Sequence, residues 1–443
     1  MRSSHSLLVG FLGTLAATAN GHTIFTTMYV DGQAQGDGTC VRMSRSEDSP
    51  TDFIKGLDNN DMACGVNGGE AVGYTCPVGA GSTLTFEWRT WANLQNPGSI
   101  DISHKGPCAV YIKQVGDMVT STAAGPGWVK IWNEGYDSTT GKWCTEKLID
   151  NKGLLSVRIP TNVPTGNYLV RPELLSLQDK GNPQFYVGCA QVAIKGSSSG
   201  KLDVPAGYSV SIPGYVKAGE PSVSFDIYQP RFPYPIPGPK VWNTQSAGAP
   251  VKVPSGDDSW ITGAQTVPGN CLLKNANWCG VEVPDYTTEA SCDAAVEDCW
   301  KQSLACYNTA PPTGSKNCKI WEAKCQSIGA ACESGNLQGP PNKGKKLENK
   351  DPKLTASIPP AGNVPSGANS GQKRAVVVRA VETVTSGTAT ITKTLSSVTG
   401  SLQTSTAVPV PGRRPGCKSK RARRARARAY RDMPVRRRNA GSL

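Results

Sequence analysis

The amino-acid sequence predicts an all-β protein built on an antiparallel β-sandwich, followed by a small disulfide-rich α-hairpin and a disordered basic tail. Three observations lead to this prediction. Residues 22–245 alternate short apolar stretches with glycine and proline turns, a pattern typical of sandwiches. Two cysteine triplets between residues 292 and 332 repeat every seven residues. From about residue 336 onward, Pro, Gly, Lys, Ser and Thr dominate, and such a segment cannot bury enough apolar surface to fold.

Residues 1–21 have the features of a signal peptide. Arg2 precedes an apolar stretch over 7–19, and Ala19 and Gly21 offer the small side chains that a signal peptidase reads. An uncleaved anchor helix is the alternative, but the run is short and interrupted by glycines. No later apolar run approaches the ~20 residues that span a bilayer. We therefore expect secretion and a mature chain that begins at His22.

The strands of the sandwich domain, residues 22–245, are predicted from alternation. Leu84, Phe86 and Trp88 share one face of a strand over 82–88. Further strands are expected at 109–115, 154–159, 168–177 and 184–194. Residues 246–270 are rich in Pro, Gly, Ser and Asp and are interpreted as a linker.

The cysteine-rich segment over 271–335 predicts a helical hairpin. A spacing of seven places each cysteine triplet along one face of a helix. An antiparallel pair of helices should join cysteines whose residue numbers have a constant sum, and three pairs meet that condition: Cys292 with Cys332, Cys299 with Cys325, and Cys306 with Cys318. Cys271 and Cys279 then pair by exclusion. Accidental spacing with a different pairing is the alternative. The module carries no evident chemistry, so its expected role is stabilisation or contact with a partner.

The net charge of +13 is concentrated in the tail, residues 336–443. Residues 413–438 hold thirteen Lys or Arg and one acid, a net charge of +12, which leaves about +1 for the rest of the chain. Charge therefore gives no argument for nucleic-acid binding by the folded part. The tail is expected either to bind an acidic wall polymer through salt-sensitive contacts or to be an inert solubilising segment.

Fifteen cysteines without a Cys-x-x-Cys pair indicate a disulfide framework formed in an oxidising compartment. The chain has three histidines, and removal of His5 with the signal peptide leaves His22 and His104. As the new N-terminus, His22 would offer a ring nitrogen and an α-amine to one metal. With a second imidazole these are ligands for copper, zinc or nickel, with copper bound most tightly.

Four motifs in order resemble the fungal lytic polysaccharide monooxygenases of auxiliary-activity family nine, over most of residues 22–228. They are His22-Thr-Ile-Phe, Ile102-Ser-His104-Lys-Gly-Pro107, Arg171-Pro-Glu173 and Gln184-Phe-Tyr186-Val-Gly-Cys189-Ala-Gln191. The resemblance implies an immunoglobulin-like or fibronectin-III-like sandwich that carries one copper. It also implies oxidative cleavage of cellulose or related β-1,4-glucans at C1 or C4, with O2 or H2O2 and an external electron donor.

The resemblance also implies roles for individual residues. His22, through its amine and ring, and His104, through its ring, match the copper ligands, and Tyr186 matches the axial tyrosine. Gln184 lies on the same strand face as Tyr186 and matches the residue that holds the oxidant by a hydrogen bond. Without the histidines, Gln184 and Tyr186 would be an ordinary strand surface.

One residue departs from the family pattern. Gln178 stands where the family commonly has a histidine that positions and protonates the oxygen species. Glutamine can donate a hydrogen bond, but it cannot exchange a proton near neutral pH. We expect copper binding to survive and turnover to be slower or its cosubstrate preference altered.

Other expectations are less specific. Tyr215 resembles the family's stacking aromatic and is expected on a glucosyl ring or in a buried tyrosine corner. Arg171 and Glu173 form either an ion pair that steadies Gln184 or a solvated surface pair. Cys76 with Cys189 matches the common disulfide of the family, and we expect Cys108 with Cys144 and Cys40 with Cys64, which leaves Cys417 unpaired.

Two other classes of function stay open beside the enzyme. A non-catalytic cellulose-binding protein would bind cellulose without forming oxidised products. A copper-handling cell-wall protein would use the histidines for metal capture. The sequence does not distinguish C1 from C4 oxidation or identify the glucan and the electron donor.

Overall fold

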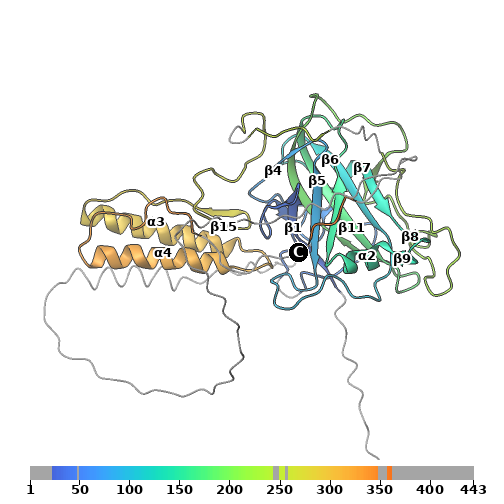
Figure 1. The fold of residues 1–443 in the computed structure, drawn as a ribbon, viewed down its shortest axis with the longest axis horizontal. Coiled ribbons are helices and arrows are strands. Elements are labelled where there is room, and N and C mark those ends of the chain that lie inside the picture. The colour runs from blue at the N-terminus through green and yellow to red at the C-terminus, as the bar shows by residue number, and fades with distance from the viewer. Residues whose placement is uncertain (1–21, 47–48, 243–248, 255–257, 348–356, 362–443) are drawn as a thin grey trace, which may run out of the picture.

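The computed structural model describes residues 22–46, 49–242, 249–254, 258–347 and 357–361, and every structural statement below concerns these residues. The signal peptide, Cys417 and the basic residues of 413–438, which we call the arginine cluster, lie outside them. Two sheets pack face to face and form the sandwich, and a pair of helices lies to one side of it (Figure 1). This arrangement confirms the predicted antiparallel sandwich followed by an α-hairpin.

The smaller sheet has the strand order β10, β5, β1, β2, and the larger has β14, β7, β6, β11, β13, β3, with β12 paired to β11 and β4 to β13. The strands of the smaller sheet are β1 (Ile24–Val30), β2 (Gln33–Ala34), β5 (Thr83–Arg89) and β10 (Leu154–Arg158). Those of the larger are β3 (Val41–Arg42), β4 (Cys76–Gly79), β6 (Cys108–Val115), β7 (Gly125–Glu134), β11 (Gly166–Ser176), β12 (Gln184–Val187), β13 (Cys189–Lys195) and β14 (Ser209–Ile212). The remaining elements are α1 (Asp61–Cys64), β8 (Tyr136–Asp137), β9 (Lys142–Trp143), α2 (Cys144–Asp150), β15 (Leu273–Asn275), β16 (Trp278–Gly280), α3 (Glu289–Asn308) and α4 (Lys316–Glu333).

Alternation along the strands builds two apolar layers. Leu84, Phe86 and Trp88 of β5 are fully buried between the sheets, as predicted. On the larger sheet, the residues that point away from the smaller sheet, such as Leu169 and Phe185, are also buried. The segment 212–236 covers them. The larger sheet is therefore covered on both faces. The predicted strand over 184–194 is interrupted at Gly188, where a Cβ atom would lie 3.2 Å from the Phe25 ring.

The disulfides of the sandwich correct two expected pairs. The structure joins Cys40 to Cys76 and Cys64 to Cys189, and it confirms Cys108 with Cys144. The reason is the face on which each sulfur lies: Cys40 and Cys76 belong to the layer between the sheets, whereas Cys64 and Cys189 belong to the outer layer. Cβ atoms joined by a disulfide lie roughly 4 Å apart, so cysteines on opposite faces of a sheet cannot pair.

The helical hairpin confirms the predicted ladder. Cys292–Cys332, Cys299–Cys325 and Cys306–Cys318 join α3 to α4 with Cα separations of 5.9, 5.4 and 5.6 Å. Cys271 pairs with Cys279 at the β15–β16 hairpin, also as predicted. Residues 336–347, which we assigned to the disordered tail, instead return along the module: Leu337 and Leu347 pack on its core, and the Leu347 amide donates to the Leu272 carbonyl.

The β15–β16 turn docks the helical module onto the sandwich. The Asn277 amide donates to the Gly38 carbonyl at 2.7 Å and accepts from the Cys40 N–H at 3.0 Å. Thr39 Oγ1 donates to the carbonyl of Ala276 at 3.1 Å. A Cβ atom on Gly38 would lie only 2.8 Å from the Ala276 Cβ, so glycine permits this close approach.

The segment interpreted as a linker lies along the sandwich, and we call its described residues, 249–254 and 258–270, the strap. Backbone and side-chain hydrogen bonds fix the strap at several points: Val251 N to Ala80 O, Met118 N to Gly263 O, Thr75 N to Gln265 O, and Asn167 Nδ2 to Thr262 O, all between 2.6 and 2.9 Å. Lys195 also lies over the Trp260 ring. The strap therefore belongs to the packed structure rather than acting as a free tether.

Candidate metal centre

The loop before β6 presents His104. The Asp101 carboxylate accepts from the Ser103 amide at 2.9 Å and the Asp101 carbonyl from the His104 amide at 3.0 Å, so the chain turns sharply just before the histidine. Beyond it, the carbonyl of Lys105 accepts from the Leu177 amide at 2.9 Å, which extends the pairing of β6 with β11. The His104 side chain is thereby held against the end of the larger sheet, and it is only 5% exposed.

His22 lies two residues before the start of β1, next to the loop that carries Asp52. The Thr23 amide donates to the Thr51 carbonyl at 3.1 Å, and His22 Nδ1 lies 2.9 Å from Asp52 Oδ1. In the whole chain the backbone nitrogen of His22 is an amide of Gly21, so an α-amine exists only after cleavage.

Tyr186 of β12 lies between the two histidines. Its ring centroid is 6.4 Å from that of His22 and 5.9 Å from that of His104. Its hydroxyl donates to Gln184 Oε1 at 2.9 Å, as expected for two residues on one strand face. Burial and the nearby Asp52 carboxylate raise the pKa of the Tyr186 phenol, which therefore stays protonated. The structure brings His22, His104, Gln184 and Tyr186 together.

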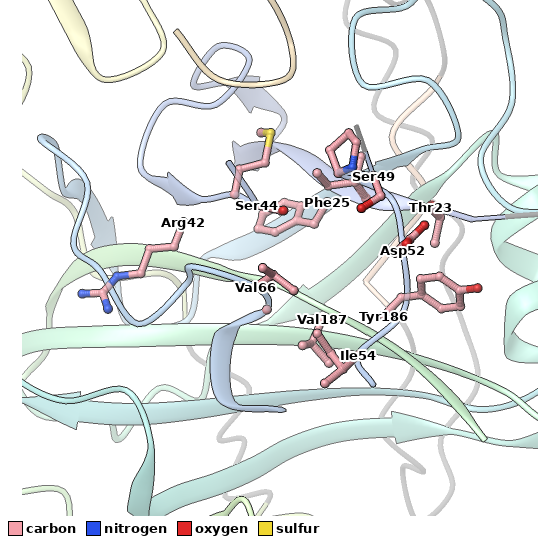
Figure 2. Close-up of a pocket in the computed structure, with 15 residues that line it drawn as sticks. Thr23, Phe25, Arg42, Ser44, Ser49, Asp52, Ile54, Val66, Tyr186 and Val187 are labelled. Atoms are coloured by element: carbon pink, nitrogen blue, oxygen red, sulfur yellow. The ribbon is translucent and has the colours of Figure 1, made fainter. Parts of the chain in front are cut away.

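A small cavity of about 20 Å³ adjoins this group, large enough for about one water molecule. Figure 2 shows Thr23, Asp52 and Tyr186 meeting at one end of the cavity. Neither His22 nor His104 lines it. The cavity is therefore a neighbour of the histidine pair and not the space between the two rings.

The histidine pair fits a metal ion at His104. Nε2 of His104 is buried and has no hydrogen-bond partner, which is a costly state unless a ligand uses its lone pair. Burial lowers the pKa of His104, against the opposing effect of the Asp101 carboxylate, and this favours the neutral imidazole at pH 7. Two imidazoles and one amine are nitrogen ligands that suit copper. No group of three or more His, Cys, Asp or Glu side chains gathers for a metal in the described part of the chain.

Arg171 and Glu173 do not occupy either expected place. Their ion pair is 2.5 Å long and fully buried, and it lies on the outer face of β11, opposite the face that carries Tyr186. Arg171 also donates through Nε and Nη2 to the Met62 carbonyl, at 3.1 and 2.8 Å. The pair therefore stabilises the outer layer and does not touch Gln184.

Tyr215 also lies in this outer layer. Its hydroxyl donates to Glu173 Oε2, and its ring packs against Tyr111 and Phe185. The hydroxyl bonds inward on the face opposite Tyr186 and the ring is partly buried, which favours the tyrosine-corner alternative over stacking on a glucosyl ring.

The sequence did not predict two residues that lie near the histidines, Ser103 and Tyr228. Ser103 Oγ lies 3.1 Å from His104 Nδ1 and 2.8 Å from Gln178 Oε1. Tyr228 is 72% exposed, and its hydroxyl donates to the Gln178 carbonyl at 3.2 Å. Adjacency to His104 could have drawn attention to Ser103. No periodic signal marked Tyr228, which sits in an irregular segment.

Comparisons with known proteins agree with these motifs. Residues 22–234 match the model of Auxiliary Activity family 9, formerly GH61. The AA9 family lytic polysaccharide monooxygenase C of Aspergillus tamarii is 49% identical over 352 residues, covering 77% of this chain and 93% of the relative. Monooxygenase H of Botryotinia fuckeliana is 43% identical over 385 residues, covering 84% and 86%. The solved structure CvAA9A is 35% identical with a TM-score of 0.46, covering 51% of this chain and all of its own. None of the described helices is long and apolar enough to cross a membrane.

Proposed function

The chain belongs to Auxiliary Activity family 9, whose members are copper-dependent lytic polysaccharide monooxygenases, and we propose that it cleaves β-1,4-glucan chains of cellulose oxidatively. His22, through its amine and Nδ1, and His104, through Nε2, would hold one copper. The copper would supply the one-electron chemistry that activates O2 or H2O2, with electrons from an external donor. Hydrogen is removed at C1, at C4 or at both.

The observation that carries this proposal is the buried, unpartnered Nε2 of His104 beside the His22 and Tyr186 rings. A surface protein that only bound cellulose would gain nothing from a desolvated imidazole lone pair, which is costly to maintain. The hydroxyl of Tyr186 and the amide of Gln184 fix each other at 2.9 Å, so both are oriented before any substrate arrives.

Maturation is part of the proposal. Cleavage after Gly21 during secretion would release the α-amine of His22, which together with Nδ1 would be available to hold the metal. Nδ1 must then leave Asp52, from which it is 2.9 Å away in the uncleaved chain. The uncleaved chain should therefore bind copper far more weakly than the secreted one.

Exposed apolar side chains beside His104 support a flat surface for the polysaccharide. Ile102 is 60% exposed and Tyr228 is 72% exposed, and the Tyr228 hydroxyl contacts the segment that carries Gln178. A planar aromatic ring on an open surface suits contact with a glucosyl ring. We assign to Tyr228 the substrate contact that was one of the two roles expected for Tyr215.

The decisive experiment combines mass analysis of the secreted protein with product analysis. We expect intact masses that begin at His22 and increase by one copper per chain. Oxidised cello-oligosaccharides should form from cellulose when a reductant is supplied, and their masses assign C1 or C4. His104→Ala should abolish both copper retention and products. Copper binding without oxidised products would instead support a copper-handling or non-catalytic cellulose-binding protein.

The arginine cluster in the tail lies outside the described residues, and binding to an acidic wall polymer stays a proposal. Truncation at Gly371 should reduce retention on a cation exchanger at low salt and leave copper binding unchanged. Equal retention of the truncated and the full-length protein would contradict binding of an acidic wall polymer by the tail.

A further inference from the structure

The hydroxyl of Ser103 has three polar neighbours that converge on it. His104 Nδ1 lies 3.1 Å away, Asp101 Oδ1 2.7 Å and Gln178 Oε1 2.8 Å. Backbone pairing brings the two segments together, because the bond from the Leu177 amide to the Lys105 carbonyl places Gln178 beside His104, the neighbour of Ser103. The three contacts therefore belong to one site rather than to three independent surface bonds.

Proton counting fixes the direction of each contact. If Nε2 of His104 keeps its lone pair for a metal, Nδ1 must carry the ring hydrogen and donate it to Ser103 Oγ. The single hydroxyl hydrogen of Ser103 can then reach either Asp101 or Gln178, and both of those atoms are acceptors. The acceptor that does not receive this hydrogen, on Asp101 or on Gln178, would then face a lone pair of Ser103 Oγ at hydrogen-bond distance, with no hydrogen between the two oxygens.

The conflict disappears if the Gln178 amide turns end for end, which changes its shape very little. Nε2–H of Gln178 then donates to Ser103 Oγ, Ser103 donates to Asp101, and His104 Nδ1–H donates to Ser103. One hydroxyl makes one donation and accepts two, which is its full capacity. Every group is satisfied, and the negative charge of Asp101 is linked to the imidazole through the hydroxyl.

We propose that Ser103, held by Asp101 and Gln178, is a positioning residue that fixes the His104 tautomer and ring orientation and leaves Nε2 for copper. Groups of this kind around a metal-bound histidine orient the ring and increase its strength as a donor. The proposal rests on the proposed function and deepens it. Gln178 then has a role that its lack of an exchangeable proton does not impair: it serves the ligand instead of the oxidant.

The first test needs no metal. The mature chain holds only His22 and His104, so the side-chain nitrogen signals in a long-range ¹H–¹⁵N spectrum are readily assigned. In the copper-free protein we expect His104 as the Nδ1–H tautomer. Ser103→Ala should shift His104 toward a mixture of tautomers, and Ser103→Thr, which keeps the hydroxyl, should restore the wild-type spectrum.

The second test measures copper binding and the Cu(II) EPR spectrum. Partner groups of this kind change metal affinity by 10–100-fold, and because Ser103 is exposed, water can partly replace it. Ser103→Ala should therefore raise the Kd for Cu(II) about tenfold and change the EPR spectrum, with recovery in Ser103→Thr. Ser121→Ala is the matched control: its hydroxyl accepts from Asp117 N at the other end of β6.

The outcomes separate the two ideas. Wild-type affinity, EPR spectrum and tautomer in Ser103→Ala would overturn the positioning role and leave the proposed function intact. A mature wild-type protein that binds no copper would overturn both. Equal losses in Ser103→Ala and Ser121→Ala would also overturn the positioning role, because they would indicate general destabilisation.

Discussion

Replacing Asn277 tests whether the helical module stabilises the sandwich. In Asn277→Ala, the Cys40 N–H loses its acceptor at a residue that is fully buried, and the Gly38 carbonyl loses its donor. A buried donor left unsatisfied costs about 1–3 kcal/mol, and an ordinary hydrogen bond contributes about 0.5–1.5 kcal/mol. The free energy of unfolding should therefore fall by about 2–4 kcal/mol.

Thermal unfolding under non-reducing conditions measures this loss. At roughly 2–4 °C per kcal/mol for large domains, Tm should fall by about 4–16 °C. Asn336→Ala is the control, because Asn336 is an exposed residue of the same module whose side chain accepts only from the Gln338 amide at 3.1 Å. Equal Tm values for the two variants would show that the module is a separate unit that merely touches the sandwich.

Two further predictions concern pH and substrate. Burial lowers the pKa of Lys130 to about 8, against the opposing effect of Glu173, so between about pH 8 and 10 the unfolded chain holds a proton that the native chain has lost. The free energy of unfolding, measured by urea unfolding, should rise by about 1–3 kcal/mol over that range, and in Lys130→Met it should not rise. The same pH dependence in Lys130→Met and the wild-type protein would contradict the assignment of the lowered pKa to Lys130. Tyr228→Ala should weaken cellulose binding several-fold at unchanged copper affinity, whereas Phe232→Ala, another exposed aromatic stacked on Tyr136, should not. Equal effects of these two changes would remove Tyr228 from the substrate surface.

The sequence was most informative where the period of a helix or a strand fixes which residues lie on one face. In α3 and α4 the helical period ties a spacing of seven to one face, so the ladder and its pairing followed from residue numbers alone. The strand period placed Gln184 and Tyr186 together in the same way. These are local rules that tertiary packing did not change.

It was least informative where the result depended on which layer covers which face. Arg171 and Glu173 were expected near Gln184 or at the surface, because the outer face of a sandwich is usually polar. In this chain the segment 212–236, which includes Tyr215, covers that face and buries the pair. The pairing of Cys64 depended on the same outer layer, and no periodic pattern in the sequence predicts that layer.

Composition was an unreliable guide in the strap. The strap is rich in Pro, Gly and Ser, yet its described residues make backbone hydrogen bonds at fixed points of the sandwich.

Similarity to the Aspergillus tamarii relative covers 77% of the 443 residues, which is more than residues 1–245 can supply. The similarity therefore extends beyond the family match, which ends at residue 234.

The strap also affects how the molecule behaves in a concentrated solution. Among the described strands, β4 pairs only with β13, which leaves one edge of the larger sheet without a strand partner. An open edge is a template on which another chain can add a strand. The Thr75 amide and the Ala80 carbonyl, which flank β4, are both taken by the strap, through Gln265 and Val251. A protein cut before Val251 would present that edge uncovered to its neighbours. Self-association, rather than loss of chemistry, is then the first defect to expect from a catalytic domain shortened to the family boundary.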